Sequence, residues 1–341
     1  MTASLIAGGR RRRARRRHAV IGGASALLLA GFTLTLMLGQ SFVAPQTVLR
    51  VLAGQDVPGA SFTVGQLRLP RAVVAILAGL SFGLGGAAFQ IMLRNPLASP
   101  DIIGISRGAS VAAVLAIVVL DLDGPMVSVM AVIAGLAVAI AIHGLASRGG
   151  VAGTRLILVG IGVSAMLDSV IAWTLSRAPS WDLAEAMRWL TGSVNGAHLS
   201  QALPLLASLA VFGGLLVSRS RDLETLRLGD DTAAALGTDV AATRVAVIVA
   251  AVGLIAVATA ITGPIAFVAF LSGPIAARIL GPNGSVLIPA ALVGAALVLV
   301  GDYAGQFLLP ARFPVGVVTG ALGAPYLIYL IVRMNRTGGS L

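Results

Sequence analysis

The sequence predicts an all-α, polytopic membrane protein with about ten transmembrane helices. Of its 341 residues, 57% are hydrophobic and 11% are charged, whereas a soluble domain carries about a quarter charged residues. The mean hydropathy is +0.96. The 42 glycines suit helices that pack closely in lipid. These observations predict a single transmembrane domain over residues 19–333.

The N-terminus carries a strongly basic run. Seven of the 24 cationic residues lie in Arg10–Arg17, and all 24 are arginine. A basic run before an apolar span is typical of a cytoplasmic anchor on anionic lipid, so the net charge of +11 does not indicate nucleic-acid binding. Residues 1–18 are therefore interpreted as a basic cytoplasmic tail. A signal peptide is the alternative, but the apolar stretch that follows is long enough to cross a bilayer and lacks a clear cleavage site.

Apolar stretches of about 20 residues predict the individual spans. In order, they are 19–39, 70–93, 101–120, 125–146, 154–176, 201–217, 243–262, 265–280, 286–308 and 314–333. Gly104 and Gly108 crowd the start of the third span, and Gly273-Pro274 is expected to interrupt the eighth. Broken helices are tolerated in a bilayer only where protein or a cavity covers the freed backbone groups. Both spans are therefore expected to face the interior of the bundle.

The arginines predict the orientation of these spans. With the N-terminus inside, 18 of the 24 arginines are cytoplasmic and 6 are outside, which is the usual positive-inside bias. An even number of spans puts the C-terminal tail, residues 334–341, on the cytoplasmic side as well. Two outer segments, Val43–Leu52 and Leu183–Val194, are predicted to form surface helices.

A polar segment, residues 218–244, separates the sixth span from the seventh. Gly229-Asp230-Asp231-Thr232 predicts a turn with a helix N-cap, residues 233–236 predict a short helix, and Gly237 is a natural C-cap. Two short helices lying flat under a membrane bundle would have this pattern. An ordinary solvated loop is the alternative.

Two carboxylates, Asp168 and Asp302, fall inside predicted spans, where a charge is costly and indicates a functional site by default. Asp302 is expected to hold neighbouring helices rather than to bind substrate. Asp168 could bind the coupling ion of a proton- or sodium-driven transporter. A structural hydrogen bond to Ser164 or Ser169 is the preferred alternative.

Enzyme, metal and cofactor sites are not indicated. Cysteine is absent, and the sequence contains no phosphate-binding loop and no metalloprotease or hydrolase motif. Any use of ATP would therefore depend on a partner.

Four stretches carry a family resemblance. They are RLPR, NPLASP and GISRGA within residues 68–109, WLTGSVNGA at 189–197, LRLGDDTAAALGTDV at 226–240, and residues 262–329 with LPARFPVG and GAPYLIY. Together and in this order they resemble the FecCD/BtuC-like permease subunits of bacterial ABC importers for iron–siderophore chelates, haem and cobalamin. Departures from the family pattern include Arg107, where many members carry Ser, Asn or Thr, and Gly273-Pro274, which replaces Pro-His.

The resemblance implies the architecture and the partners of the chain. It implies a BtuC-like permease fold in a bacterial cytoplasmic membrane, with both termini cytoplasmic and two permeases around a central path. Two cytoplasmic ABC ATPase subunits and an extracytoplasmic substrate-binding protein would complete the importer. A ferric siderophore is the expected substrate, with haem or cobalamin as alternatives.

The resemblance also implies three groups of functional residues. The ATPase-coupling residues would be Leu228, Gly229, Asp230, Ala233, Ala234, Leu236 and Gly237. The translocation path, or helix breaks beside it, would include Gln90, Asn95, Pro96, Gly104, Gly108, Gly273 and Pro274. Docking of the binding protein would involve Arg68, Arg71, Gln306 and Arg312.

The docking residues bear on oligomeric state. Gln306 stands where the family carries a docking arginine, and Arg312 replaces a nearby acidic residue. A subunit with half of these arginines missing suits a heterodimer with a second, related permease. If Arg312 compensates locally, a homodimer remains possible. The rival functions are an ion-coupled secondary transporter that uses Asp168 and a membrane-bound structural subunit.

Overall fold

The computed structural model describes residues 2–99, 104–146, 153–281 and 284–336, and within these ranges the secondary structure is helical throughout. The first half contains α1 (Thr2–Met37), α2 (Pro45–Leu52), η1 (Ser61–Arg68), α3 (Leu69–Met92), α4 (Ile105–Val118), α5 (Gly124–Ala146), α6 (Gly153–Leu175) and α7 (Ser180–Thr191). The second half contains η3 (Leu199–Gln201), α8 (Ala202–Ser208), η4 (Leu209–Gly213), α9 (Gly214–Ser218), α10 (Ser220–Leu226), α11 (Asp230–Ala235), α12 (Val240–Thr262), α13 (Val268–Leu280), α14 (Leu287–Phe307) and α15 (Val315–Arg336).

These helices confirm the polytopic all-α prediction. Among the described residues, eight helical stretches are long and apolar enough to cross a membrane, including the composite stretches Ser61–Met92 and Leu199–Ser218. The other two predicted spans are the shorter apolar helices α4, with 14 residues, and α13, with 13 residues. At 1.5 Å per residue each is about 20 Å long, less than the hydrocarbon thickness of about 30 Å. Neither helix is therefore long enough by itself to cross the hydrocarbon layer.

The prediction that Gly273-Pro274 interrupts the eighth span is wrong. Helix α13 is continuous through Pro274, and the break lies before the helix, at residues 263–267, where Gly263 and Phe267 have positive φ angles. A proline inside a helix leaves the carbonyl four residues earlier without its N–H partner, here that of Phe270. The side-chain amide of Gln90 donates to this carbonyl at 2.9 Å. The helix continues because α3 supplies the missing donor.

Both chain ends extend as helix beyond the predicted spans. The basic run that was predicted as a tail is helical and continues into the first span within α1. At the other end, α15 reaches Arg336, and the predicted tail residues 337–341 lie outside the described residues.

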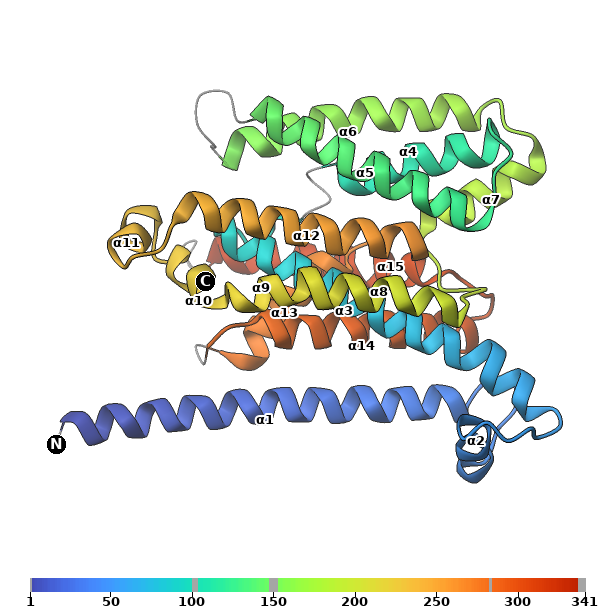
Figure 1. Ribbon diagram of the computed structural model, residues 1–341, viewed down its shortest axis with the longest axis horizontal. Coiled ribbons are helices and arrows are strands. Elements are labelled where there is room, and N and C mark those ends of the chain that lie inside the picture. Colours follow the sequence, from blue (N-terminus) through green and yellow to red (C-terminus); the bar gives the residue numbers. More distant parts are fainter. Residues whose placement is uncertain (1, 100–103, 147–152, 282–283, 337–341) are drawn as a thin grey trace.

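Helix α3 lies at the centre of the bundle and packs on α12, α13 and α14 (Figure 1). Of its most apolar stretch 83% is buried, against 6% for α1 and 17% for α6. The contact with α14 is close because both helices carry glycine there. A Cβ on Gly83 would lie 2.3 Å from the carbonyl oxygen of Ala290, and one on Gly294 would lie 2.2 Å from that of Gly79. Small residues thus let the two backbones touch.

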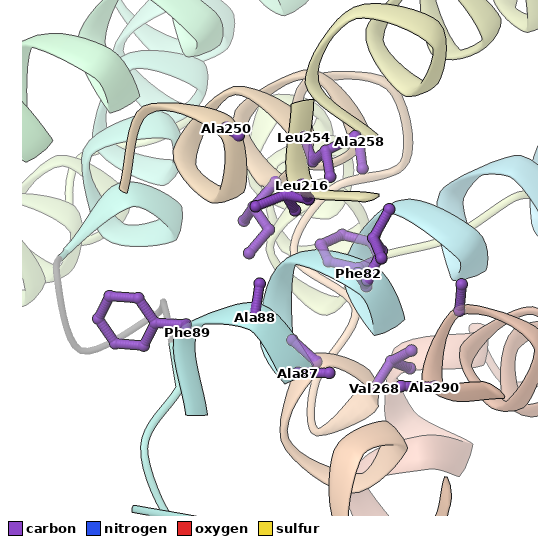
Figure 2. Packing of buried hydrophobic residues seen from close by; sticks show 14 of the residues in the cluster. Phe82, Ala87, Ala88, Phe89, Leu216, Ala250, Leu254, Ala258, Val268 and Ala290 are labelled. Atoms are coloured by element: carbon purple, nitrogen blue, oxygen red, sulfur yellow. The ribbon is translucent and has the colours of Figure 1, made fainter. Parts of the chain in front are cut away.

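The opposite face of α3 packs on larger side chains. Figure 2 shows Phe82 and Ala88 of α3 near Leu216 of α9 and Leu254 of α12. All four are buried in the main apolar cluster. Helices α4, α5 and α6 form a second group, which reaches the centre mainly through α12 (Figure 1).

The polar helices lie at one end of the molecule. The N-terminal end of α1 is at the same end as α10 and α11, and α2 and α7 are at the opposite end (Figure 1). Helix α2 lies within the first segment predicted as a surface helix, Val43–Leu52, and α7 overlaps the second, Leu183–Val194. The side arrangement is the one that the charge pattern predicts, with the polar segment on the side of the N-terminus.

Candidate functional site

The polar segment folds into two short helices, α10 and α11, rather than a solvated loop. Buried Leu223 and Leu226 anchor α10 on the bundle. Positive φ angles at Gly229 (106°) and Gly237 (87°) bracket α11 and require glycine there. The predicted two-helix pattern is confirmed.

The predicted contact residues of α11 differ in exposure. Leu228 and Leu236 are 62% and 61% exposed, and Ala234 is exposed too. Ala233 was expected to touch an ATPase, but its side chain is fully buried against the bundle. That part of the prediction is wrong, because the helix turns this position inward. Of the predicted coupling residues, Leu228, Ala234, Leu236 and Gly237 are exposed.

Asp230 fastens α11 to the bundle. One oxygen of its carboxylate lies 2.7 Å from Nη2 of Arg244 in α12, and the other lies 3.4 Å from Nη2 of Arg94, just after α3. An isolated exposed ion pair stabilises by about 0–1 kcal/mol. Here one carboxylate joins three elements, so the position of α11 is tied to the ends of α3 and α12. The sequence pointed to Asp230 but not to its arginine partners.

The predicted helix-break residues at the end of α3 gather around Gln90. Its Nε2 donates to the carbonyls of Pro96 and Phe270, each at 2.9 Å. The backbone carbonyl of Gln90 accepts a hydrogen bond from the backbone N–H of Asn95 at 3.0 Å. A Cβ on Gly273 would lie 2.0 Å from Oε1 of Gln90, so only glycine admits this side chain. Gln90 thus joins the turn after α3 to α13.

The glycines at the start of α4 pack against α5. A Cβ on Gly108 would lie 2.7 Å from Cγ2 of Val138, and one on Gly104 would lie 2.8 Å from Cδ1 of Ile142. Gly104 also has a φ of 71° as the residue that precedes α4. These two glycines allow close helix packing, and the cavity described next is lined by other residues.

A cavity of about 440 Å³ lies among α3, α4, α7, α13, α15 and the break before α13. It is lined by Phe82, Leu97, Ser99, Ser106, Arg107, Ser110, Leu190, Pro264, Ile265, Ala266, Phe267, Phe270 and Leu327. Among the described residues, most of the wall is apolar, with three serines and one charged residue, Arg107. The two shortened spans both contribute to it, as expected for broken helices that face the interior.

The two intramembrane carboxylates are both paired with arginine. Asp302 is 4% exposed and makes a bidentate pair with Arg71, at 2.5 Å to Nε and 2.6 Å to Nη2. Arg71 also donates to Asn195 at 3.1 Å. These bonds join α3, α14 and the chain after α7, which agrees with a helix-holding role for Asp302.

The partner of Asp168 differs from the expected one. Its Oδ1 lies 3.0 Å from Nη1 of Arg107, across from α6 to α4. Ser169, one of the serines expected to bind it, donates to the carbonyl of Ala165 instead. A hydroxyl one position along a helix points to a different face, whereas a long arginine from a neighbouring helix can reach the carboxylate.

The predicted docking arginines are engaged within the chain. Arg68 donates through Nη1 to the carbonyls of Leu36 and Met37, both at 2.9 Å, and through Nη2 to that of Ser41 at 2.7 Å. It therefore closes the C-terminal end of α1, and Arg71 holds Asp302. Within the predicted docking set, Gln306 is partly exposed and Arg312 is exposed.

This arrangement of buried central helix, broken spans and polar end helices has known counterparts. A model of the FecCD transport family matches residues 27–333, most of the chain. The chain belongs to the FecCD transport family. It is a transmembrane permease, embedded in the inner membrane by several passes.

Curated relatives and a solved structure agree with this family. The achromobactin transport system permease protein CbrC of Dickeya dadantii is 38% identical over 91% of this chain and 90% of its own. The ferric enterobactin transport system permease proteins FepG and FepD of Escherichia coli are 39% and 32% identical, over 85% and 92% of this chain and 88% and 94% of their own. A metal-chelate type ABC transporter, solved in an inward-facing conformation, superposes with a TM-score of 0.82 at 25% identity, covering 92% of this chain and 99% of its own.

Proposed function

We propose that this permease carries a ferric siderophore inward, driven by ATP hydrolysis in a separate subunit. The observation that carries the proposal is the exposed surface of α11. Leu228, just before this helix, and Leu236, just after it, remain exposed, and Asp230 fixes the helix to the ends of two spans. A partner that pushes on this surface moves the bundle rather than a loose loop. The named cargo of CbrC and FepG supports a siderophore as substrate.

The partner at α11 is an ABC ATPase, and the binding protein docks at the opposite end. Ala234→Arg places a long charged side chain on the exposed face of α11. We expect it to abolish ATP-driven uptake of radiolabelled ferric siderophore in proteoliposomes that contain permease, ATPase and binding protein. Ala234→Ser is the matched control, because serine is small enough to keep the surface. Normal uptake by Ala234→Arg would contradict the assignment of this surface.

In the proposed orientation, both termini and α11 lie in the cytoplasm. The sequence lacks cysteine, so a single introduced cysteine reports its own position. Asp121→Cys, between α4 and α5, should react with an impermeant maleimide added to intact cells, and Thr232→Cys in α11 should react only after the membrane is opened. The reverse labelling pattern would overturn both the orientation and the ATPase contact.

The second permease is a related, non-identical chain. The names FepG and FepD describe two different permeases of one Escherichia coli system, which supports this arrangement. The replacement of a docking arginine by Gln306 supports a heterodimer as well. Tagged permease expressed from its native operon should co-purify with a second FecCD-type chain. An active complex with this permease as its sole membrane subunit would establish a homodimer instead.

A further inference from the structure

The cavity beside the broken spans is lined by a charged residue whose counter-ion is not part of the lining. Arg107 lines the wall together with Ser106 and Ser110, whereas Asp168, its acidic partner, does not. Apart from a third serine, Ser99, the remaining described wall is formed by apolar side chains. A molecule in this space therefore meets, among the described residues, a mostly apolar surface with the positive charge of Arg107.

Arg107 is held less tightly than the other intramembrane arginine. Arg71 grips Asp302 with two nitrogens, at 2.5 Å and 2.6 Å, and that carboxylate is 6% exposed. Arg107 touches Asp168 through Nη1 at 3.0 Å, and the two side chains are 51% and 48% exposed. The guanidinium group has five N–H donors in a planar fork. Its contact with Asp168 therefore leaves it able to bind a second anionic group.

An arginine at membrane depth is costly unless it faces a cavity or a partner. Arg107 faces both a cavity and a partner, and two roles are possible for its pair with Asp168. In a purely structural role, the pair would join α4 to α6 whether or not cargo is present. As a cargo contact, Asp168 would neutralise Arg107 while the cavity is empty, and an anionic ligand would compete for the guanidinium group.

We propose that Arg107 determines specificity, favouring ferric chelates of net negative charge over neutral ones, with Asp168 as the counter-ion that such cargo displaces. This inference rests on the proposed transport function. Planar guanidinium binds paired anionic oxygens in bidentate fashion, as catecholate and carboxylate chelators present them. The apolar wall suits the organic rim of the chelate, and 440 Å³ lies within the range of small-molecule sites, about 300–1,000 Å³.

The test compares two chelates of similar size, one anionic and one neutral. A ferric tris-catecholate is anionic, because three dianions outweigh Fe³⁺, and a ferric trihydroxamate is neutral. Binding of each radiolabelled chelate to the purified complex of permeases and ATPase in nanodiscs is measured by equilibrium dialysis. The binding protein is omitted, because its own selectivity would mask that of the permease.

The parent complex should bind the tris-catecholate more tightly than the trihydroxamate. Arg107→Gln should weaken tris-catecholate binding about tenfold, the size of one charge-assisted hydrogen bond, and leave the trihydroxamate unchanged. Asp168→Asn removes the competing carboxylate and should tighten tris-catecholate binding. Arg107→Gln/Asp168→Asn leaves neither charge unpaired and should bind both chelates equally. Arg50→Gln, which removes the same charge from exposed α2, is the matched control and should change nothing.

Two results would overturn the inference while leaving the transport function standing. One is equal affinity of the parent complex for the two chelates together with ATP-driven uptake. The other is an equal loss for both chelates in Arg107→Gln and in Asp168→Asn, as a purely structural role would produce. The complete absence of ATP-driven uptake of any chelate by the full importer would overturn the proposed function and this inference together.

Discussion

Gln90→Leu tests whether the α3 amide replaces the hydrogen bond that Pro274 removes from α13. Gln90 is 6% exposed, and its Nε2 serves two carbonyls, those of Pro96 and Phe270. Leucine has a similar size but no donor. A buried carbonyl left without a partner costs about 1–3 kcal/mol, so loss of the Phe270 bond lowers the free energy of unfolding by about that amount, and loss of the partly buried Pro96 bond adds less.

A double-mutant cycle isolates the Phe270 contribution. Pro274→Ala restores the backbone N–H that can bond the Phe270 carbonyl within the helix. In that background Gln90→Leu leaves one carbonyl without a donor instead of two. The loss in free energy of unfolding that it causes should therefore be smaller by about 1–3 kcal/mol. The free energies are measured by reversible unfolding of the purified permease in mixed micelles as the fraction of denaturing detergent rises. Costs that simply add across the cycle would refute this coupling.

Three further predictions follow from other contacts. Asp230→Asn should change stability by about 1 kcal/mol or less, yet lower the siderophore imported per ATP hydrolysed, whereas Asp231→Asn, on the exposed side of α11, should change neither. Gly83→Val should destabilise the purified permease by about 1–3 kcal/mol or more because its backbone contact leaves no room, and Gly22→Val, with open space around it, should be neutral in the same unfolding assay. Arg68→Leu should expose the end of α1 to protease, because three carbonyls lose their donor, and unchanged cleavage would contradict that closure.

The hydropathy of the sequence was sufficient to predict the fold class and the spans. Each span is a local run of apolar residues, and membrane insertion depends mainly on such runs. The turn residues Gly229 and Gly237 were sufficient to predict the two short helices, because glycine by itself tolerates a positive φ. Side-chain direction within α11 was not predictable, and the buried position of Ala233 was missed, because six residues contain too little pattern to define a face.

The tertiary structure alone decided which side chains meet. Arg71 and Asp302 are 231 residues apart, and Gln90 and Phe270 are 180 apart. Asp168 was singled out from the sequence, but its partner Arg107 comes from another helix. Local periodicity fixes neither the rotation nor the depth of one helix against another, and those two quantities determine every such contact. The same cause explains why α13 continues through Pro274: the sequence shows the proline, but the donor that serves the Phe270 carbonyl comes from a distant helix.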